Sequence, residues 1–242
     1  MAPEGAAFWL QILAFLCLGN LIWVGFVAMR QRDLNGLISN SSVAHMGFIF
    51  LGISSFSVVG LTGAVVVMVA HGLLAALCFG LSGYVYQQGG SLNMDSMGGI
   101  LRSSPRLGWG LMIAFLAGCG VPGFANFAGE LLTLMGSWET TPGIVVGAAW
   151  SGLIIGAVYM FKAIRSILHG KVNHVWEGIA DLKGGALFAT VALSLGLLLF
   201  GVAPFLLTDK VEPAVVDLAG SVTIEHPEAN VSLAVLESNP TQ

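Results

Sequence analysis

Several uncharged apolar runs of about 20 residues or more constrain this chain more than any other feature. Only 9% of its 242 residues are charged and 56% are hydrophobic, against ~25% charged residues in a typical soluble domain. A helix needs about 20 apolar residues to cross the hydrocarbon core of a bilayer. Lipid offers no partners to backbone N–H and C=O groups, so such runs fold as helices that bond internally. The sequence therefore predicts an all-α, multi-pass membrane protein.

Six membrane-spanning helices are predicted, over residues 6–29, 39–60, 63–86, 107–137, 143–168 and 185–208. The stretch 107–137 is too long for one ordinary span and too short for two. Pro122 lies inside it, and proline removes an amide donor and clashes with the preceding helical turn. Gly123 follows directly. We therefore expect one discontinuous span, broken near Pro122.

The basic residues support a single crossing by 107–137. Cytoplasmic loops of membrane proteins carry an excess of Lys and Arg. With one crossing there, eight of the nine basic residues fall on one side of the membrane, the exception being Lys210. Both termini are then predicted on the non-cytoplasmic side. The first span lacks a basic segment before it, so we expect it to be retained rather than cleaved as a signal peptide.

The segment after residue 208 differs in composition from the rest. It contains six acidic residues with several Pro and Ser, which predicts an acidic, flexible, non-cytoplasmic tail over 209–242. No basic patch indicates nucleic-acid binding. Cys17, Cys78 and Cys119 lie far apart in apolar spans, without metal-ligand spacing. We expect no metal, no cofactor and no electron transfer by this chain.

Glu130 is the acidic residue that lies deepest in a predicted span, eight residues after Pro122. A carboxylate within the membrane is costly, so its presence is a functional hypothesis by default. The alternative is a structural carboxylate bonded to a neighbouring helix. All four lysines of this chain lie at the ends of the spans or outside them, so a partner lysine for Glu130 has to come from another chain.

Two histidines also fall within the predicted spans. His71 lies nine residues into the 63–86 helix, deep enough to require the bundle interior or water around it. His45 lies near the start of the 39–60 helix. Imidazole exchanges protons near neutral pH, so both could carry a proton path, with His45 at its cytoplasmic mouth. The alternatives are an interfacial His45 and an interior His71 that bridges two helices by hydrogen bonds.

Residues 33–48 (DLNGLISNSSVAHMGF) resemble the signature DIKRLIAYSSVSHMGF of the antiporter-like membrane subunits of respiratory complex I (NADH:quinone oxidoreductase). Three further segments match in the same order, namely 70–73, 97–100 and 121–130. Lysine generally follows the glycine at position 129 in the L and N subunits and in Mrp-type antiporters, whereas glutamate is typical of the M type. The resemblance is therefore to the M type.

The resemblance implies one five-helix antiporter-like repeat plus a terminal helix, the C-terminal half of a fourteen-helix subunit. Glu130 would be the terminal protonatable group of a channel, with His71 and His45 joining it to a central lysine and the cytoplasm. Partners would be other complex I membrane subunits, a separate chain supplying the N-terminal half, and the lipid bilayer. The location implied is the bacterial inner membrane.

Departures from the family pattern leave three functions open. Asn35 and Gly36 replace the usual Lys-Arg pair, and Asn40 replaces Tyr. The first function is a proton-translocating half-module that couples quinone reduction to pumping. The second is a subunit of an Mrp antiporter or membrane-bound hydrogenase. The third is a non-conducting structural remnant of the membrane arm.

The predicted orientation can be tested by cysteine labelling from each side of the membrane. In a background without the three native cysteines, Glu139→Cys should react only from the non-cytoplasmic side, and Ser91→Cys only from the cytoplasm. Reaction of Glu139→Cys from the cytoplasm alone would contradict the single broken span.

Overall fold

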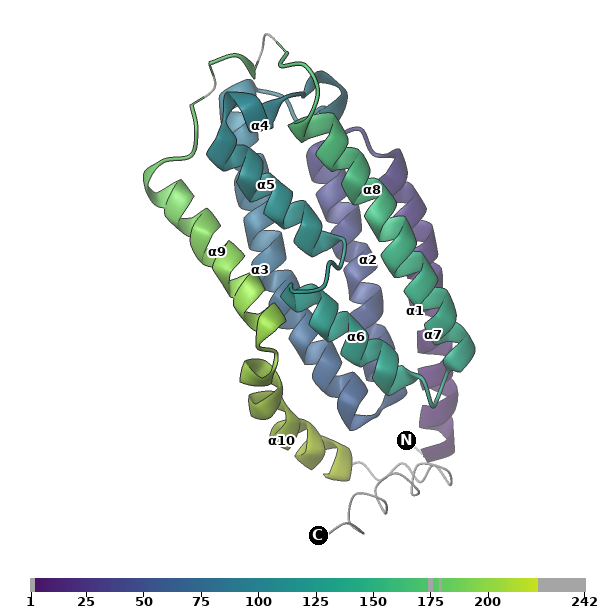
Figure 1. The fold of residues 1–242 in the computed structure, drawn as a ribbon. Coiled ribbons are helices and arrows are strands. Elements are labelled where there is room, and N and C mark those ends of the chain that lie inside the picture. Colours follow the sequence, from purple (N-terminus) through teal and green to yellow (C-terminus); the bar gives the residue numbers. More distant parts are fainter. Residues whose placement is uncertain (1–2, 174–175, 179, 222–242) are drawn as a thin grey trace.

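The computed structural model describes residues 3–173, 176–178 and 180–221, which form a bundle of helices (Figure 1). Five continuous helices in this part are long and apolar enough to cross a membrane. Two shorter helices of 14 and 13 residues lie between them as one interrupted span. The described residues contain no β-strand beyond one isolated bridge. The all-α membrane fold with one discontinuous span is confirmed.

Helices α1 (Pro3–Arg30), α2 (Leu34–Ser55) and α3 (Val58–Gly89) run up and down the bundle. The Asp33 carboxylate caps α2 by accepting from the Gly36 N–H, and the Ser57 hydroxyl caps α3 by accepting from the Gly60 N–H. Both helices therefore begin five residues before the predicted starts at 39 and 63. The residues from Ser39 onwards, at the predicted start of the helix, therefore lie inside α2.

A short polar stretch precedes the interrupted span. It contains the single turns η1 (Met94–Ser96) and α4 (Ile100–Ser103). The span itself consists of α5 (Pro105–Gly118) and α6 (Ala125–Ser137), separated by the non-helical residues 119–124. The structure thus places Pro122 and Gly123 within the interruption.

The next span, predicted at 143–168, runs from Pro142 to Leu168 without a break. It is built from α7 (Pro142–Ala149), the π-helical η2 (Trp150–Ile155), α8 (Gly156–Ala163) and the π-helical η3 (Ile164–Leu168). Such π-segments insert an extra residue into a turn and often occur at functional sites. Here η2 contributes Ser151 and Gly152 to the lining of the cavity described below.

The C-terminal region differs from the expected single helix over 185–208. Helix α9 (Gly184–Val202) ends before Pro204, and α10 (Phe205–Ser221) follows. Pro204 has no amide proton to continue α9. Residues 209–221 of the predicted flexible tail are therefore helical, and residues 222–242 lie outside the described residues.

The contact between α3 and α6 holds the centre of the bundle together. The two helices are antiparallel, because Gly60, Gly63 and Val67 of α3 approach Gly136, Thr133 and Gly129 of α6, respectively. A Cβ added at Gly63 would lie 2.6 Å from the Thr133 nitrogen, and one at Gly129 would lie 2.8 Å from the Val67 nitrogen. Glycines let the backbones approach this closely, as is common between helices in lipid.

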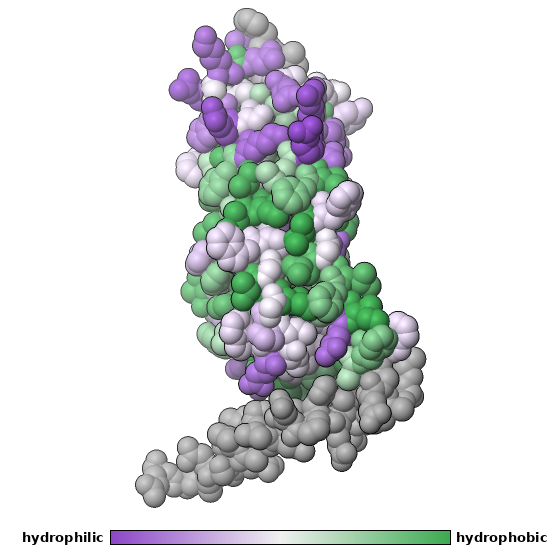
Figure 2. Space-filling model, turned by 90° about the vertical axis from the view of Figure 1, so that its right-hand side faces the viewer, coloured by the Kyte–Doolittle hydropathy of each residue, from purple (hydrophilic) through white to green (hydrophobic). Residues whose placement is uncertain are grey.

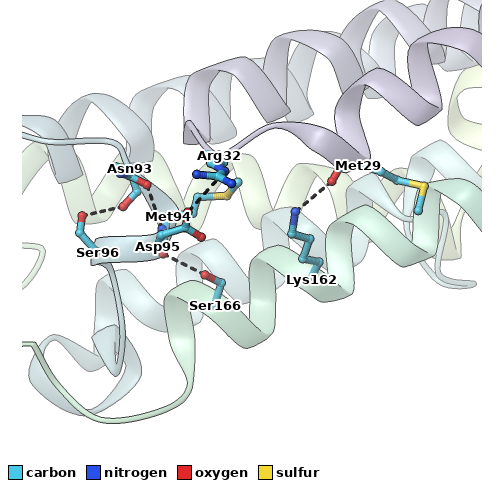
Figure 3. A network of polar contacts seen from close by, with 8 residues as sticks. All are labelled: Met29, Arg32, Asn93, Met94, Asp95, Ser96, Lys162 and Ser166. Atoms are coloured by element: carbon cyan, nitrogen blue, oxygen red, sulfur yellow. Dashed lines mark hydrogen bonds and ion pairs between the residues drawn. The ribbon is translucent and has the colours of Figure 1, made fainter.

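The surface divides into an apolar middle and polar ends. Figure 2 shows an apolar band around the molecule, with hydrophilic residues gathered most densely at the end that carries η1, α4 and the segment before α9. Hydrogen bonds to backbone carbonyls connect the segments at this end (Figure 3). Met94 donates its N–H to the Arg32 carbonyl at 2.8 Å, Ser166 donates to the Met94 carbonyl at 2.9 Å, and Lys162 donates to the Met29 carbonyl at 2.9 Å.

Adding one methyl group to the α3–α6 contact should destabilise the bundle. In Gly136→Ala the new Cβ would overlap the backbone of Gly60, and overpacking of this kind costs about 1–3 kcal/mol. We expect a lower midpoint of thermal unfolding in detergent and less folded protein in membranes. Gly80→Ala on α3 is the matched control, because a Cβ there meets nothing within 4 Å. Equal unfolding midpoints for the two variants would contradict the close contact.

Candidate functional site

Glu130 lies in the second turn of α6, six residues after the interruption ends, with only 6% of the residue exposed. Its carboxylate points towards the interruption on one side and towards α2 on the other. A Cβ added at Gly120 would lie 3.0 Å from Oε2, and Oε1 faces the ring of His45. The acid predicted from the sequence is therefore buried where the two halves of the broken span meet.

His45 is the partner of Glu130 within this chain. Its Nε2 lies 3.4 Å from Oε1 of Glu130, and its Nδ1 lies 2.7 Å from the carbonyl oxygen of Ser41. A carbonyl can only accept, so Nδ1 is the donor and carries a proton. The contact between Nε2 and Oε1 can hold one further proton, either on the imidazole or on the carboxyl group.

His71 of α3 stacks on His45 of α2. The ring centroids are 5.3 Å apart and the ring planes differ by 29°. His71 is 9% exposed, and its Nδ1 has no hydrogen-bond partner. The structure thus brings together all three titratable residues singled out in the sequence, in the order His71, His45, Glu130.

One expectation about this group needs correction. We expected His45 near the start of its helix, but α2 begins at Leu34. At 1.5 Å per residue, His45 therefore lies about 16 Å along the helix, and it is only 4% exposed. The sequence had not indicated that an imidazole of the same chain lies beside Glu130.

The interruption of the span provides room for the carboxyl group. Gly120 has a φ of 69°, a left-handed conformation that side chains rarely adopt, and a Cβ there would crowd the Glu130 carboxyl group. Gly123 has a φ of 102°, but a Cβ added there would meet nothing within 4 Å. Gly123 and Pro122 therefore shape the turn, whereas Gly120, which the sequence analysis did not single out, borders the acid.

A small cavity of about 10 Å³ adjoins Glu130 and His45. That volume is at the lower limit for one water molecule. Tyr159 also lines the cavity and is only 3% exposed. Its hydroxyl lies 3.2 Å from the Ser41 hydroxyl, which links α8 to α2. The sequence analysis did not single out Tyr159.

Asn126 is a second residue that the sequence analysis missed. It lies four residues before Glu130 on α6 and is fully buried. Residues four apart share a helix face, so a polar side chain at this spacing in a short apolar helix was a readable signal. Among the described residues, no three His, Cys, Asp or Glu side chains gather as a metal-binding group.

Three known proteins match most of this chain. NAD(P)H-quinone oxidoreductase chain 4 3 of Trichormus variabilis is 32% identical over 231 residues, covering 90% of this chain and 42% of the relative. NADH-quinone oxidoreductase subunit M of Rickettsia prowazekii is 31% identical over 191 residues, covering 78% of this chain and 39% of the relative. A chain of respiratory complex I from Thermus thermophilus with bound NADH superposes with a TM-score of 0.82 at 31% identity, covering 91% of this chain and 46% of that one.

The chain therefore spans less than half the length of these relatives. Its residues 3–156 match the family described as NADH:quinone oxidoreductase/Mrp antiporter, TM. That match covers more than half of the sequence and includes Glu130, His71 and His45. The chain belongs to the NADH:quinone oxidoreductase/Mrp antiporter transmembrane family.

Proposed function

We propose that this chain is a proton-translocating part of an M-type membrane-arm subunit of NADH:quinone oxidoreductase, coupling quinone reduction to proton pumping. The contact between His45 and Glu130 carries the proposal. It places a proton-exchanging base 3.4 Å from a buried acid, beside an interrupted helix. Interrupted helices at membrane depth occur where they line a cavity or are buried in protein, and they mark ion sites in transporters.

The geometry lets one proton move between His45 and Glu130 with little movement of heavy atoms. Ser41 holds the Nδ1 proton of His45 in place, so the exchangeable proton is the one between Nε2 and Oε1. With that proton on Nε2, the pair is an imidazolium and a carboxylate. With it on Oε1, both groups are neutral. Loss of the proton from the neutral pair leaves a lone negative charge, which the apolar surroundings disfavour.

The relay in this proposal runs through His71 and His45 to Glu130. The stacked rings at 5.3 Å set the two histidines close enough to influence each other's charge. A lysine on the remaining part of the M-type subunit would gain and lose a proton opposite this group. Each change of charge there would favour the opposite charge at the His45–Glu130 pair.

Partners and location follow from the same proposal. The chain spans about two fifths of its quinone oxidoreductase relatives. We propose that it assembles with other complex I membrane subunits and with a separate chain that supplies the N-terminal half. These partners would hold the redox centres, and this chain would hold none. We place the assembly in a bacterial inner membrane, with both termini of this chain on the non-cytoplasmic side.

An Mrp-type antiporter subunit is the second candidate, because the family includes both classes. Glutamate at position 130 favours the M type, since Mrp antiporter subunits generally carry lysine there. A sodium requirement for transport by the assembled protein would favour the antiporter instead. A structural remnant, the third candidate, does not require the close approach of His45 to Glu130.

Replacing Glu130 with glutamine should impair pumping while leaving assembly intact. Glutamine keeps the size and hydrogen-bonding capacity of the side chain but cannot give up a proton. A positioned proton-transfer group contributes of the order of 10²–10⁴-fold in rate, so we expect proton uptake coupled to quinone reduction to fall at least about tenfold. Glu130→Asp should have an intermediate effect, because the shorter carboxyl group is farther from His45.

The exposed acid Glu139 offers a control with the same chemical change. Glu139→Gln should pump like the parent protein. Assembled complex, quinone reduction and proton uptake are to be measured in the same membranes. Normal pumping by a fully assembled Glu130→Gln complex would refute the relay and leave the structural role.

A further prediction concerns assembly. Helices α1 and α9 bury only 28% and 17% of their membrane-spanning windows within the bundle, and large side chains such as Trp23 (74% exposed) and Phe188 (75%) face outward. We expect the chain to co-purify with hydrophobic complex I subunits in mild detergent. Isolation as a monodisperse monomer without other subunits would contradict this expectation.

A further inference from the structure

Asn126 is buried without any hydrogen-bond partner. The residue is 0% exposed, and neither Oδ1 nor Nδ2 forms a hydrogen bond in the structure. A primary amide has two donor hydrogens and an acceptor oxygen, and leaving such groups unpaired in an apolar interior is costly. A side chain of this kind needs a physical explanation, and packing alone does not supply one.

The register of α3 and α6 shows which group lies nearest to Asn126 along the helix axes. Successive contacts pair Gly60 with Gly136, Gly63 with Thr133, and Val67 with Gly129. As the numbers rise on α3 they fall on α6, so the two helices run antiparallel. One turn beyond the Val67–Gly129 contact, α3 reaches residues 70 and 71, while α6 reaches residues 125 and 126. Asn126 is therefore level with His71.

The two residues at this level lack complementary partners. Nδ1 of His71 is buried and unpaired, as are both polar atoms of the Asn126 side chain. Of the other buried atoms without partners, Thr62 lies nine residues earlier on α3, and Ser194 belongs to α9. Nine residues correspond to about 13 Å along a helix. The imidazole and the amide are thus the two unpaired groups that the register brings to one level.

We propose that Asn126 is a positioning residue for proton transfer through His71, and that its amide is the hydrogen-bond partner of Nδ1 across the α3–α6 contact. This proposal rests on the proton relay proposed above. The two groups are not hydrogen-bonded in the structure, so the proposed contact requires rotation of a side chain or one bridging water molecule. The amide serves both states of the ring, because Oδ1 accepts from a protonated Nδ1 and Nδ2 donates to a bare one.

An amide that can either donate or accept suits a relay, because it does not titrate. The Asn126 amide rotates to match the protonation state of His71, and the proton stays on the ring or moves to the next group. The imidazole is then held between the stacked ring of His45 and the amide. No covalent bond forms or breaks at Asn126.

The experiment uses the assembled complex in membranes. Asn126→Leu keeps nearly the same volume and removes both polar atoms, so we expect proton uptake per quinone reduced to fall severalfold. Asn126→Ser retains a group that donates and accepts, and it should pump better than the equally small Asn126→Ala. Thr62→Val is the control, because it removes an unpaired buried hydroxyl of α3 at a different level and should leave pumping unchanged.

A double-variant comparison tests whether Asn126 acts through His71. In a His71→Phe background, Asn126→Leu should cause no further loss, since residues that act together are not additive. If the double variant loses the product of the two single losses in pumping, the proposal is overturned. Normal pumping by an assembled Asn126→Leu complex would also overturn it. If the leucine variant does not assemble, the Ser and Ala variants decide, and equal pumping by those two overturns the proposal.

The outcome is distinguishable from failure of the relay as a whole. Glu130→Gln is measured alongside the Asn126 variants. Reduced pumping in Glu130→Gln with normal pumping in Asn126→Leu would leave the proposed function standing and reject the role of Asn126. Normal pumping in Glu130→Gln would reject the proposed function itself.

Discussion

The burial of one carboxyl group governs the arrangement of this bundle. Glu130 is 6% exposed in a helix surrounded by apolar side chains, where an uncompensated charge is costly. Its partner is His45 at 3.4 Å, and the turn at Gly120 and the small cavity lined in part by α2, α6 and α8 lie beside it. The interruption of the span between Gly118 and Ala125 makes this possible. A continuous helix would place ordinary backbone turns where the carboxyl group now lies.

Close packing of helices fixes the distances within this group. The glycine contacts between α3 and α6 bring two backbones together, and this sets the level of His71 on α3 relative to Asn126 on α6. Helix α2 packs against both, which brings His45 to the ring of His71 and to the carboxyl group of Glu130. Small residues at helix contacts thus do more than stabilise the bundle, because they determine which polar groups meet.

Much of the molecule was predictable from sequence alone, and the errors have identifiable causes. Helix starts at Leu34 and Val58 were missed because capping by Asp33 and Ser57 depends on local backbone geometry. Residues 209–221 of α10 were read as tail because their acidic residues resemble those of unfolded segments. Tyr159 was missed because nothing in its own segment shows that it faces the interior.

The sequence by itself determined the all-α membrane fold, the break near Pro122, and the three titratable residues Glu130, His71 and His45. These features are local, since hydropathy, the missing amide of proline and the cost of charge in lipid act along one segment. Only the tertiary structure decided that His45 contacts Glu130, that the histidine rings stack, and that Asn126 lies level with His71. Such pairings depend on the register between helices far apart in sequence, which side-chain packing sets and no single segment encodes.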